Sequence, residues 1–339
     1  MSSSIRFGYR AVAEQYGPSQ LLEFAVDAEK QGFEFISISD HFHPWFHEGG
    51  HAAFAWAWIA SAAERTERVQ IGTGVTTPIN RYHPAIVAQC FATLGAMYPG
   101  RIFLGLGTGE AMNEVPVGQR WPPFRERVKR VEESLDIIRG LWEKEFFSYK
   151  GKYFSVQDAN IYDKPTKPVP IYLAASGATM AEVAGRRADG LYTTPAKEEK
   201  LRDVLLPAAR KGAESAGRNF GDVNKMILCN VSWDEDYDRA LASIRRWRAV
   251  AVPGSFEKEV WDPRELDRLG ESVPMEDLTW RWTICTDLED VVKKVEGYIA
   301  LGFNEIEIRS GSPDEKAFIT KFGREILPQL REKYQGKQG

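Results

Sequence analysis

The chain has 339 residues, and its 44 lysines and arginines nearly balance its 48 aspartates and glutamates, which leaves a formal net charge of -4. This balance argues against bulk nucleic-acid binding, which needs strongly basic surfaces. The opening stretch MSSSIRFGYR has no apolar signal segment, and no run approaches the roughly 20 apolar residues of a membrane span. Three scattered cysteines offer neither a disulfide framework nor metal-ligand spacing. We therefore expect a soluble, cytoplasmic protein without nucleic-acid or membrane partners.

Short β-branched runs alternate with helical patterns along the whole chain. The first predicted strand, residues 5–10, is followed by a helix that begins near Pro18 and ends at Gly32. The other predicted strands are residues 34–39, 69–77, 101–109, 169–176, 189–194, 225–233 and 304–311. A helical pattern follows each strand and no linker is visible. The sequence therefore predicts a single (β/α)₈ TIM-barrel domain over residues 1–339, with a doubly wound open sheet as the competing topology.

Two segments exceed a minimal barrel. Residues 145–168 are predicted to form a hairpin-like excursion, and residues 249–280 a long insertion rich in prolines, charges and aromatic residues. We expect both at the C-terminal face, where insertions usually build or cover a substrate pocket. The run GLGTGE at residues 105–110 lacks the third glycine of a dinucleotide-binding fingerprint, so we discount a Rossmann site.

Polar and aromatic side chains follow several predicted strands, where a barrel gathers its active-site groups. They are Glu14, Asp40, His41, Trp45, Glu110, Asn113, Ser176 and Gly177. His41 and Glu110 come from different strand ends, and a histidine that titrates near neutrality beside a carboxylate suits proton transfer. The pair favours an enzyme over a binding module. A cap, turn or core role for each of these residues remains the alternative.

The stretch SDHFHPW also permits a metal interpretation. His41 and His43 resemble the paired histidines that open the sites of metal-dependent hydrolase barrels, but such sites need further histidines from later strands. No histidine occurs after His83, so we predict no metal. We expect His43, His47 and His51 to be loop or cap residues.

Four stretches together resemble the luciferase-like barrel superfamily: SDHFHPW, GTGVTTP, RIFLGLGTGEAMNE and YLAASGATMAEVAGRRADGLYTT. More specifically, they look like its deazaflavin branch, the coenzyme F420-dependent glucose-6-phosphate dehydrogenases, and the resemblance covers essentially the whole chain. It implies a homodimeric oxidoreductase of carbohydrate metabolism. Such an enzyme transfers a hydride from C1 of a sugar 6-phosphate to coenzyme F420 and releases the 6-phospholactone.

The resemblance also implies roles for individual residues. His41, Trp45 and Glu110 match the catalytic positions: His41 would be the base or a stabilising group, Trp45 would shape the substrate side, and Glu110 would protonate the reduced ring. The implied cofactor-binding residues are Asp40, Gly74, Val75, Thr108, Gly109, Asn113, Ser176, Gly177 and Ala178, with a non-prolyl cis peptide around Gly74 and Val75. The implied substrate-binding residues are Glu14, Thr194, Lys197, Lys258 and Arg281. The last three are cations that would hold the phosphate.

Two places depart from the family pattern, and both touch the sugar side. They are His43-Pro44, in the loop that carries Trp45, and Pro195-Ala196 in the run TTPAK. Glucose 6-phosphate is therefore the expected substrate, while another sugar 6-phosphate such as fructose 6-phosphate stays open. The rival functions are an F420-dependent alcohol dehydrogenase or reductase on an unphosphorylated substrate, an FMN-dependent luciferase-like monooxygenase, and a catalytically silent cofactor-binding barrel. Residue chemistry alone does not distinguish F420 from FMN.

Overall fold

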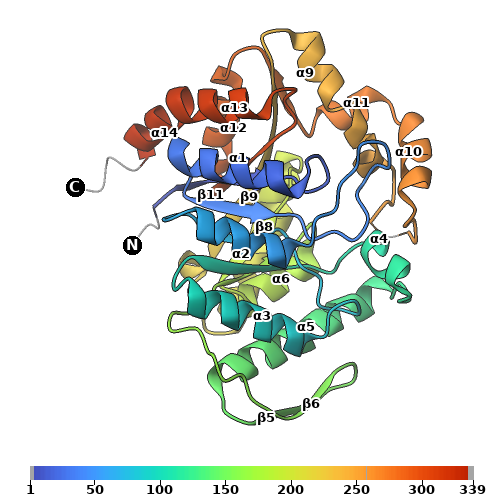
Figure 1. Cartoon of the computed structure of the whole chain (residues 1–339), viewed down its shortest axis with the longest axis vertical. Coiled ribbons are helices and arrows are strands. Elements are labelled where there is room, and N and C mark those ends of the chain that lie inside the picture. Colours follow the sequence, from blue (N-terminus) through green and yellow to red (C-terminus); the bar gives the residue numbers. More distant parts are fainter. Residues whose placement is uncertain (1–3, 257, 335–339) are drawn as a thin grey trace.

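The centre of the molecule is a closed parallel barrel, in a computed structural model that describes residues 4–256 and 258–334 (Figure 1). Its strands are β1 (Arg6–Ala11), β2 (Phe35–Ile38), β3 (Gln70–Thr73), β4 (Ile102–Leu106), β7 (Ile171–Ala174), β8 (Gly190–Thr193), β9 (Asn224–Trp233) and β11 (Glu305–Ser310). Each pairs in parallel with the next, and β11 pairs with β1 to close the ring. The predicted barrel is confirmed and the open sheet is wrong. The single domain over residues 1–339 remains a prediction, since its two ends and residue 257 lie outside the described residues.

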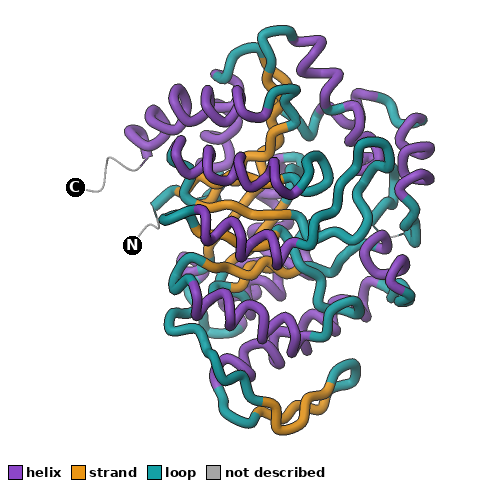
Figure 2. Tube along the Cα trace, in the orientation of Figure 1, coloured by secondary structure: helices purple, strands orange, loops and turns teal. Residues whose placement is uncertain are grey.

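Helices surround the barrel (Figure 2). The longer ones are α1 (Pro18–Gln31), α2 (Ala55–Arg65), α3 (Pro84–Met97), α5 (Phe124–Glu143), α6 (Ala178–Arg187), α8 (Leu206–Ser215), α12 (Glu289–Ala300), α13 (Glu315–Lys321) and α14 (Leu327–Tyr334). As predicted, α1 begins at Pro18, whose fixed φ suits the first turn, and Gly32 ends it in the left-handed region at φ 99°. None of the described helices combines the length and apolar character that a membrane crossing requires.

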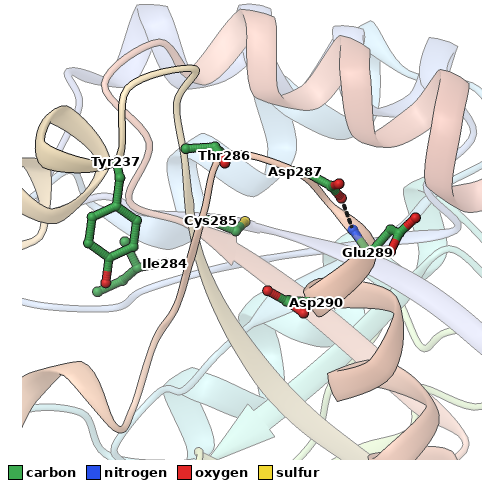
Figure 3. Close-up of a pocket in the computed structure, with 7 residues that line it drawn as sticks. All are labelled: Tyr237, Ile284, Cys285, Thr286, Asp287, Glu289 and Asp290. Atoms are coloured by element: carbon green, nitrogen blue, oxygen red, sulfur yellow. Dashed lines mark hydrogen bonds between the residues drawn. The ribbon is translucent and has the colours of Figure 1, made fainter.

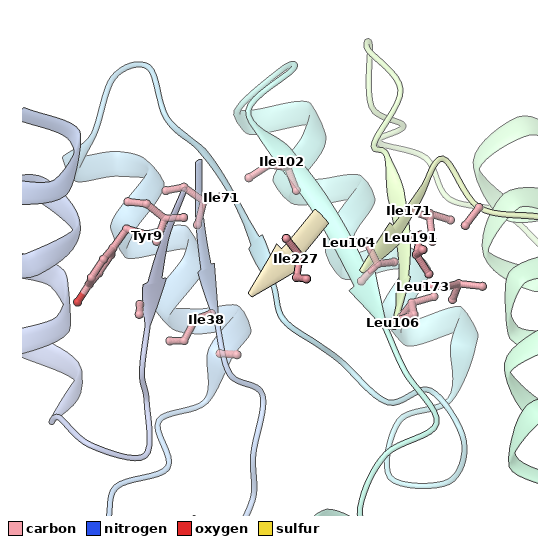
Figure 4. Packing of buried hydrophobic residues seen from close by; sticks show 14 of the residues in the cluster. Tyr9, Ile38, Ile71, Ile102, Leu104, Leu106, Ile171, Leu173, Leu191 and Ile227 are labelled. Atoms are coloured by element: carbon pink, nitrogen blue, oxygen red, sulfur yellow. The ribbon is translucent and has the colours of Figure 1, made fainter. Parts of the chain in front are cut away.

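Alternate residues of each strand point to opposite sides of the barrel wall. The outward-facing residues pack against the helices and form the largest apolar core, part of which is drawn in Figure 4. Its members include Tyr9, Ile38, Ile71, Leu104, Ile171, Leu191 and Ile227. The inward-facing residues make a smaller cluster inside the barrel, formed by Phe35, Phe103, Tyr172, Tyr192, Met226 and Leu228.

The segment 145–168 contains the predicted hairpin, built from β5 (Phe147–Lys150) and β6 (Ser155–Ala159). It packs on the outer side of α5: a Cβ at Gly140 of that helix would lie 2.4 Å from the Phe147 ring. In Figure 1 it lies at the lower edge of the molecule, outside the helix layer. This insertion follows a helix rather than a strand, so it lies away from the C-terminal mouth where we expected it.

The second insertion belongs to a longer segment, which we call the β9–β10 excursion (residues 234–282). It contains α9 (Tyr237–Ser243), η4 (Arg245–Ala251), α10 (Pro263–Glu271) and α11 (Met275–Thr279). The chain then returns as β10 (Thr283–Cys285), which pairs in parallel with the last part of β9. The prediction missed β10 because three residues are too few to show a strand period.

Candidate active site

The C-terminal strand ends bring most of the predicted site residues to one rim of the barrel, since parallel strands end on the same face. Glu14 follows β1, Asp40 and His41 follow β2, Gly74 and Val75 follow β3, Thr108 to Glu110 follow β4, Ser176 to Ala178 follow β7, and Thr194 follows β8. Asn113 lies in α4 (Ala111–Glu114), the short helix that Glu110 precedes.

His41 and Glu14 face each other on this rim. The His41 Nε2 atom lies 3.6 Å from Glu14 Oε1, and the other Glu14 oxygen accepts a 2.6 Å hydrogen bond from the Ser39 hydroxyl. Burial raises the pKa of Glu14, but the neighbouring His41, Arg10 and Arg309 outweigh it, so the pKa is lowered overall. Glu14 is therefore a carboxylate at neutral pH, placed to stabilise a protonated His41. The Nδ1 atom of His41 is buried without a hydrogen-bond partner among the described residues.

Glu110 is tied to the His41 loop through Asn113. The Asn113 amide nitrogen donates to Glu110 Oε2 at 3.0 Å, and its oxygen accepts a 2.8 Å bond from the backbone N–H of Phe42. Asn113 itself is 1% exposed. The buried Asn113 side chain thus links the Glu110 carboxyl group, which follows β4, to the loop that follows β2.

Asp40 is 2% exposed, and both of its oxygens have partners. The Thr76 hydroxyl donates to Oδ2 at 2.7 Å, while Arg81 and the Tyr82 hydroxyl donate to Oδ1 at 3.1 and 3.2 Å. Sequence reasoning missed these partners, because nothing in the sequence shows that residues 76–82 fold back over Asp40. The carboxylate therefore holds the β2 and β3 loops together, and its expected place beside the cofactor ring stays a prediction.

The backbone at Gly74 and Val75 is held from inside the barrel. The Gly74–Val75 peptide bond is cis, as the family resemblance implied. Arg10 of β1 donates to the Gly74 carbonyl, to Ser37 Oγ at 2.8 Å and to the Tyr192 hydroxyl at 3.2 Å. Arg10 was not predicted as a site residue. The available signal was its place on a strand whose alternate residues, Phe7 and Tyr9, are apolar.

Two further predicted cofactor positions are fixed by one arginine of α5. Arg127 donates from Nη1 to the carbonyls of Thr108 and Gly109 at 3.3 and 3.2 Å. Its guanidinium also lies 4.1 Å from the ring centroid of Trp121. The backbone after β4 is therefore anchored to the helix layer.

The remaining cofactor candidates surround the start of α6. Gly177 precedes this ten-residue helix without a side-chain cap, and Ser176 and Ala178 are exposed. A Cβ placed on Gly177 would meet nothing within 4 Å. The N–H groups of this first turn therefore lack a side-chain cap and lie beside exposed residues, which suits a phosphate group.

Trp45 lies in a second apolar cluster that covers the rim. This rim cluster joins residues of the β1, β2 and β4 loops to the β9–β10 excursion: Val12, Trp45, Phe46, Met112, Ile244, Trp247, Ala249, Leu266, Leu278 and Trp282. The Trp45 ring is 5.0 Å from that of Phe256 and 6.3 Å from that of His41. Trp45 is therefore both a packing residue and a neighbour of His41.

The three cations of the predicted phosphate site come from separate segments. Lys197 precedes α7 (Glu198–Lys200), Lys258 follows a turn closed by its own N–H bond to the Gly254 carbonyl, and Arg281 follows α11. The two lysines are exposed, whereas burial lowers the pKa of Arg281. None of the three forms an ion pair within residues 4–256 and 258–334, and no hydrogen bond links them to His41 or Glu110. Their charges are available to an anion, while their convergence on one phosphate remains a prediction.

His43 and His47, which follow His41 in the chain, contact other segments than His41 does. The His43 Nδ1 atom lies 3.1 Å from the Trp261 carbonyl, and the backbone N–H of His47 donates to Asp267. These contacts dock the β2 loop on the β9–β10 excursion. His41 and His43 therefore serve different neighbours, which is the reverse of what a shared metal would require.

A shallow depression of about 320 Å³ lies beyond the end of β10 (Figure 3). Its lining residues are Tyr237, Ile284, Cys285, Thr286, Asp287, Glu289 and Asp290. Asp287 accepts a 2.6 Å hydrogen bond from the Glu289 N–H, so this carboxylate already caps the start of α12. The lining includes none of the predicted site residues, and the hydrogen bond of Asp287 serves the first turn of α12.

Comparison with known proteins places this arrangement in a family. Residues 1–305 match the luciferase-like monooxygenase family. The F420-dependent glucose-6-phosphate dehydrogenase of Kribbella flavida is 46% identical over 330 residues, which are 97% of this chain and 99% of that protein. The protein of the same name from Nakamurella multipartita is 46% identical over 328 residues, or 96% and 97% of the two chains.

A solved structure is also similar over nearly its whole length. An F420-dependent secondary alcohol dehydrogenase in complex with an F420-acetone adduct matches with a TM-score of 0.94 at 39% identity, over 97% of this chain and 99% of that chain. The coenzyme F420-dependent tetrahydromethanopterin reductase of Methanopyrus kandleri, at 22% identity and a TM-score of 0.81, shares the fold. The chain therefore belongs to the luciferase-like monooxygenase family, and its nearly full-length relatives there include the F420-dependent glucose-6-phosphate dehydrogenases.

Proposed function

We propose that this protein is an F420-dependent sugar-6-phosphate dehydrogenase that oxidises C1 of glucose 6-phosphate to the 6-phospholactone. The main observation behind this proposal is that two candidate proton-transfer groups lie on one rim. His41 lies beside Glu14, and Glu110 lies beside Asn113. Relatives that are 46% identical over nearly the full length bear this activity in their names. Lys197, Lys258 and Arg281 have no ion-pair partner among the described residues, which supports their proposed role as the phosphate site.

The residues of the rim fit coenzyme F420. The α6 N-terminus leaves backbone N–H groups open at Gly177, as a phosphate-bearing tail needs. The backbone at Gly74 and Val75 is fixed by Arg10, and that at Thr108 and Gly109 by Arg127. These residues, with Asp40, Asn113, Ser176 and Ala178, would hold the cofactor. When bound, F420 supplies the carbon that accepts the hydride.

His41 is the proposed base. The Nδ1 atom is buried without a hydrogen-bond partner among the described residues, and Nε2 lies 3.6 Å from Glu14, so we assign the imidazole to accept the proton of the C1 hydroxyl. The Glu14 carboxylate, 3.6 Å from Nε2, then stabilises the imidazolium that forms. Glu110 is the proposed proton donor, and the Asn113 amide orients its carboxyl group. Trp45 excludes water beside His41 and shapes the sugar side.

The phosphate would lie between Thr194, Lys197, Lys258 and Arg281. Three cations are more than enough to neutralise a dianion, and the planar guanidinium of Arg281 adds paired donors for two phosphate oxygens. The Arg281 side chain stacks on Trp280 at 4.4 Å, which limits its motion. Pro195, between Thr194 and Lys197, stiffens the same loop.

An F420-dependent alcohol dehydrogenase is the second candidate, because the structure that matches with a TM-score of 0.94 bears that name. An unphosphorylated alcohol would make no use of the cations at Lys197, Lys258 and Arg281. The two functions therefore differ in what removal of these cations does.

The test is loss of the visible absorbance of F420 with purified protein and glucose, glucose 6-phosphate, fructose 6-phosphate or isopropanol. We expect bleaching with the phosphosugars alone, with glucose 6-phosphate fastest. Lys258→Ala should raise KM for glucose 6-phosphate on the order of tenfold or more, since charge-assisted hydrogen bonds contribute about 1.5–3 kcal/mol. The control Lys293→Ala changes an exposed lysine of α12 and should leave KM unchanged. Bleaching with isopropanol alone, or an unchanged KM in Lys258→Ala, contradicts the proposal.

A homodimer and a cytoplasmic location are part of the same proposal, and they rest on the family resemblance. Sedimentation of the purified protein measures the first, and fractionation of the source cells measures the second. A monomer that retains full activity would contradict the dimer without touching the proposed reaction.

A further inference from the structure

Strand β11 carries a charged residue at every second position: Glu305, Glu307 and Arg309. Glu305 accepts a 2.9 Å bond from Arg6 and Glu307 accepts one from Tyr192, both inside the barrel. Since alternate residues of a strand share a face, Arg309 points to the same interior, at the C-terminal end where the rim lies. The intervening isoleucines belong to the outer core.

Arg309 is held against two indole rings of the rim cluster. Its guanidinium carbon lies 3.7 Å from the ring centroid of Trp247 and 5.2 Å from that of Trp282. Indole faces attract a cation and restrict its rotation, and the planar guanidinium stacks well on them. The side chain is therefore oriented before any ligand arrives, which lowers the entropic cost of binding.

The charge of Arg309 has no hydrogen-bond or ion-pair partner among residues 4–256 and 258–334. The other inward-facing arginines, Arg6 and Arg10, both contact carboxylates. Burial is the main reason that the pKa of Arg309 is lowered to about 10, with Glu14 acting in the opposite sense. Burying a cation without a hydrogen-bond partner costs free energy. A ligand with several oxygen atoms can offset this cost by accepting hydrogen bonds.

Two neighbours place Arg309 between the two ends of the proposed substrate. Its charge helps to lower the pKa of Glu14, the carboxylate beside His41, so it lies on the reacting side. It also stacks on Trp282, the residue that follows Arg281 of the proposed phosphate site. In the proposed complex the guanidinium would therefore lie between the reacting carbon and the phosphate group.

We propose that Arg309 is a further substrate-binding residue, which donates hydrogen bonds to hydroxyl oxygens of the sugar between its reacting carbon and its phosphate. This inference rests on the proposed dehydrogenase function. It requires no proton transfer from Arg309, which contributes binding and orientation through its fixed, paired donors.

The experiment compares Arg309→Met, Arg309→Lys and wild type. Methionine keeps an unbranched stem against the indoles and removes the donors, while lysine keeps the charge and loses the fork. We expect KM for glucose 6-phosphate to rise about tenfold to a hundredfold in Arg309→Met and less in Arg309→Lys, with F420 affinity by fluorescence titration unchanged. Arg245→Met, an exposed position of η4, is the matched control and should behave as wild type.

Each other outcome overturns a stated part. Suppose that the wild type is active and that Arg309→Met and Arg309→Lys both have its KM. Arg309 is then not part of the substrate site, while the proposed function stands. A weakened F420 affinity with unchanged KM assigns Arg309 to the cofactor instead. If Arg309→Met does not fold, Arg309→Lys alone decides, since an unchanged KM there contradicts the need for paired donors. Wild type that reduces no F420 with any sugar phosphate overturns the proposed function, and this inference with it.

Discussion

The two faces of the barrel wall carry different kinds of residue. The outward face, packed against the helices, is made almost wholly of aliphatic and aromatic side chains. The inward face combines an aromatic cluster with a polar network of Arg10, Tyr192 and Glu307, which ends at the rim beside Glu14 and His41. The same strands thus supply stability on one side and chemistry on the other.

This division separates the two roles in sequence, because consecutive residues of one strand serve opposite faces. A change on the outer face should therefore alter folding with little effect on the chemistry, while a change at the rim should do the reverse. The inner network lies between these limits, since it is buried and also supports the rim.

The largest expected effect is on the rim. His41→Ala should lower kcat about 10²–10⁴-fold, the usual contribution of a general base, while the variant still unfolds in one cooperative transition. Steady-state F420 reduction and urea denaturation measure the two properties. His47→Ala is the control, because this exposed side chain belongs to the same loop. A kcat within threefold of wild type would remove His41 from the role of base.

Substitutions in the inner network of Arg10, Tyr192 and Glu307 should mainly lower the free energy of unfolding. Tyr192→Phe removes the hydroxyl that accepts from Arg10 and donates to Glu307, and leaves both buried charges with one partner fewer. We expect a loss of about 1.5–3 kcal/mol in the free energy of unfolding, measured by urea denaturation. Tyr237→Phe, at an exposed tyrosine, should change it by less than about 0.5 kcal/mol. Equal effects of the two substitutions would contradict a supporting role for the network.

On the outer layer, α6 and α8 approach so closely that glycine is required. A Cβ on Gly185 would lie 1.8 Å from the Ala209 carbonyl oxygen, which is backbone and cannot turn aside. Gly185→Ala should therefore cost about 1–3 kcal/mol of unfolding free energy and leave kcat of the folded protein unchanged.

Gly297 of α12 provides the control for this change. A Cβ there would meet nothing within 4 Å, so Gly297→Ala should stabilise the protein by about 0.5–1 kcal/mol through helix propensity. Thermal denaturation that ranks the two variants in the opposite order would show that the helix crossing tolerates a methyl group.

Glu315 of the outer helix α13 is a buried acid, and it should make stability depend on pH. Glu315 is buried and accepts a 2.7 Å bond from the Tyr9 hydroxyl; burial raises its pKa to about 7. The folded state therefore prefers the protonated form. Its stabilising contribution is complete below the unfolded pKa near 4.5 and is lost as the pH rises through about 7.

Glu315→Gln should remove this loss, so the variant should gain about 1–2 kcal/mol over wild type between pH 5 and pH 8. Urea denaturation at the two pH values measures the difference. The exposed substitution Glu271→Gln should leave the pH dependence unchanged. A wild-type stability that is flat over this range would contradict the raised pKa.

The sequence predicted the barrel well because its signals are local. The eight strands carry apolar residues either in short runs or at alternate positions, and Pro18 and Gly32 mark the ends of the first helix. The sequence did not predict the short strand β10, because three residues are too few to show the alternation of a strand. The candidate site residues that follow strands, such as His41 and Glu110, were predicted from the same local logic.

The partners of the site residues could not be found in this way. Asn113 joins Glu110 to the backbone of Phe42, 71 positions away, and Arg10 reaches the Gly74 carbonyl across 64 positions. Such contacts depend on how strands close into a ring, which no local pattern records. Arg309 is an intermediate case. The alternation in EIEIRS indicates a charged inner face, but only the closed barrel shows that Trp247 lies over it.

The β9–β10 excursion has a consequence for how such enzymes diversify. It leaves the barrel at the end of β9 and returns beside the same strand, with Thr283 paired to Val231. Its length can therefore change without shifting the register of any barrel strand, and loop closure grows only slowly with length. It carries Lys258 and Arg281, whereas the proposed F420 residues lie on the β2, β3, β4 and β7 loops. The excursion thus carries part of the proposed phosphate site and none of the proposed F420 residues, so we expect a relative's excursion grafted here to change the substrate range and leave F420 binding unchanged.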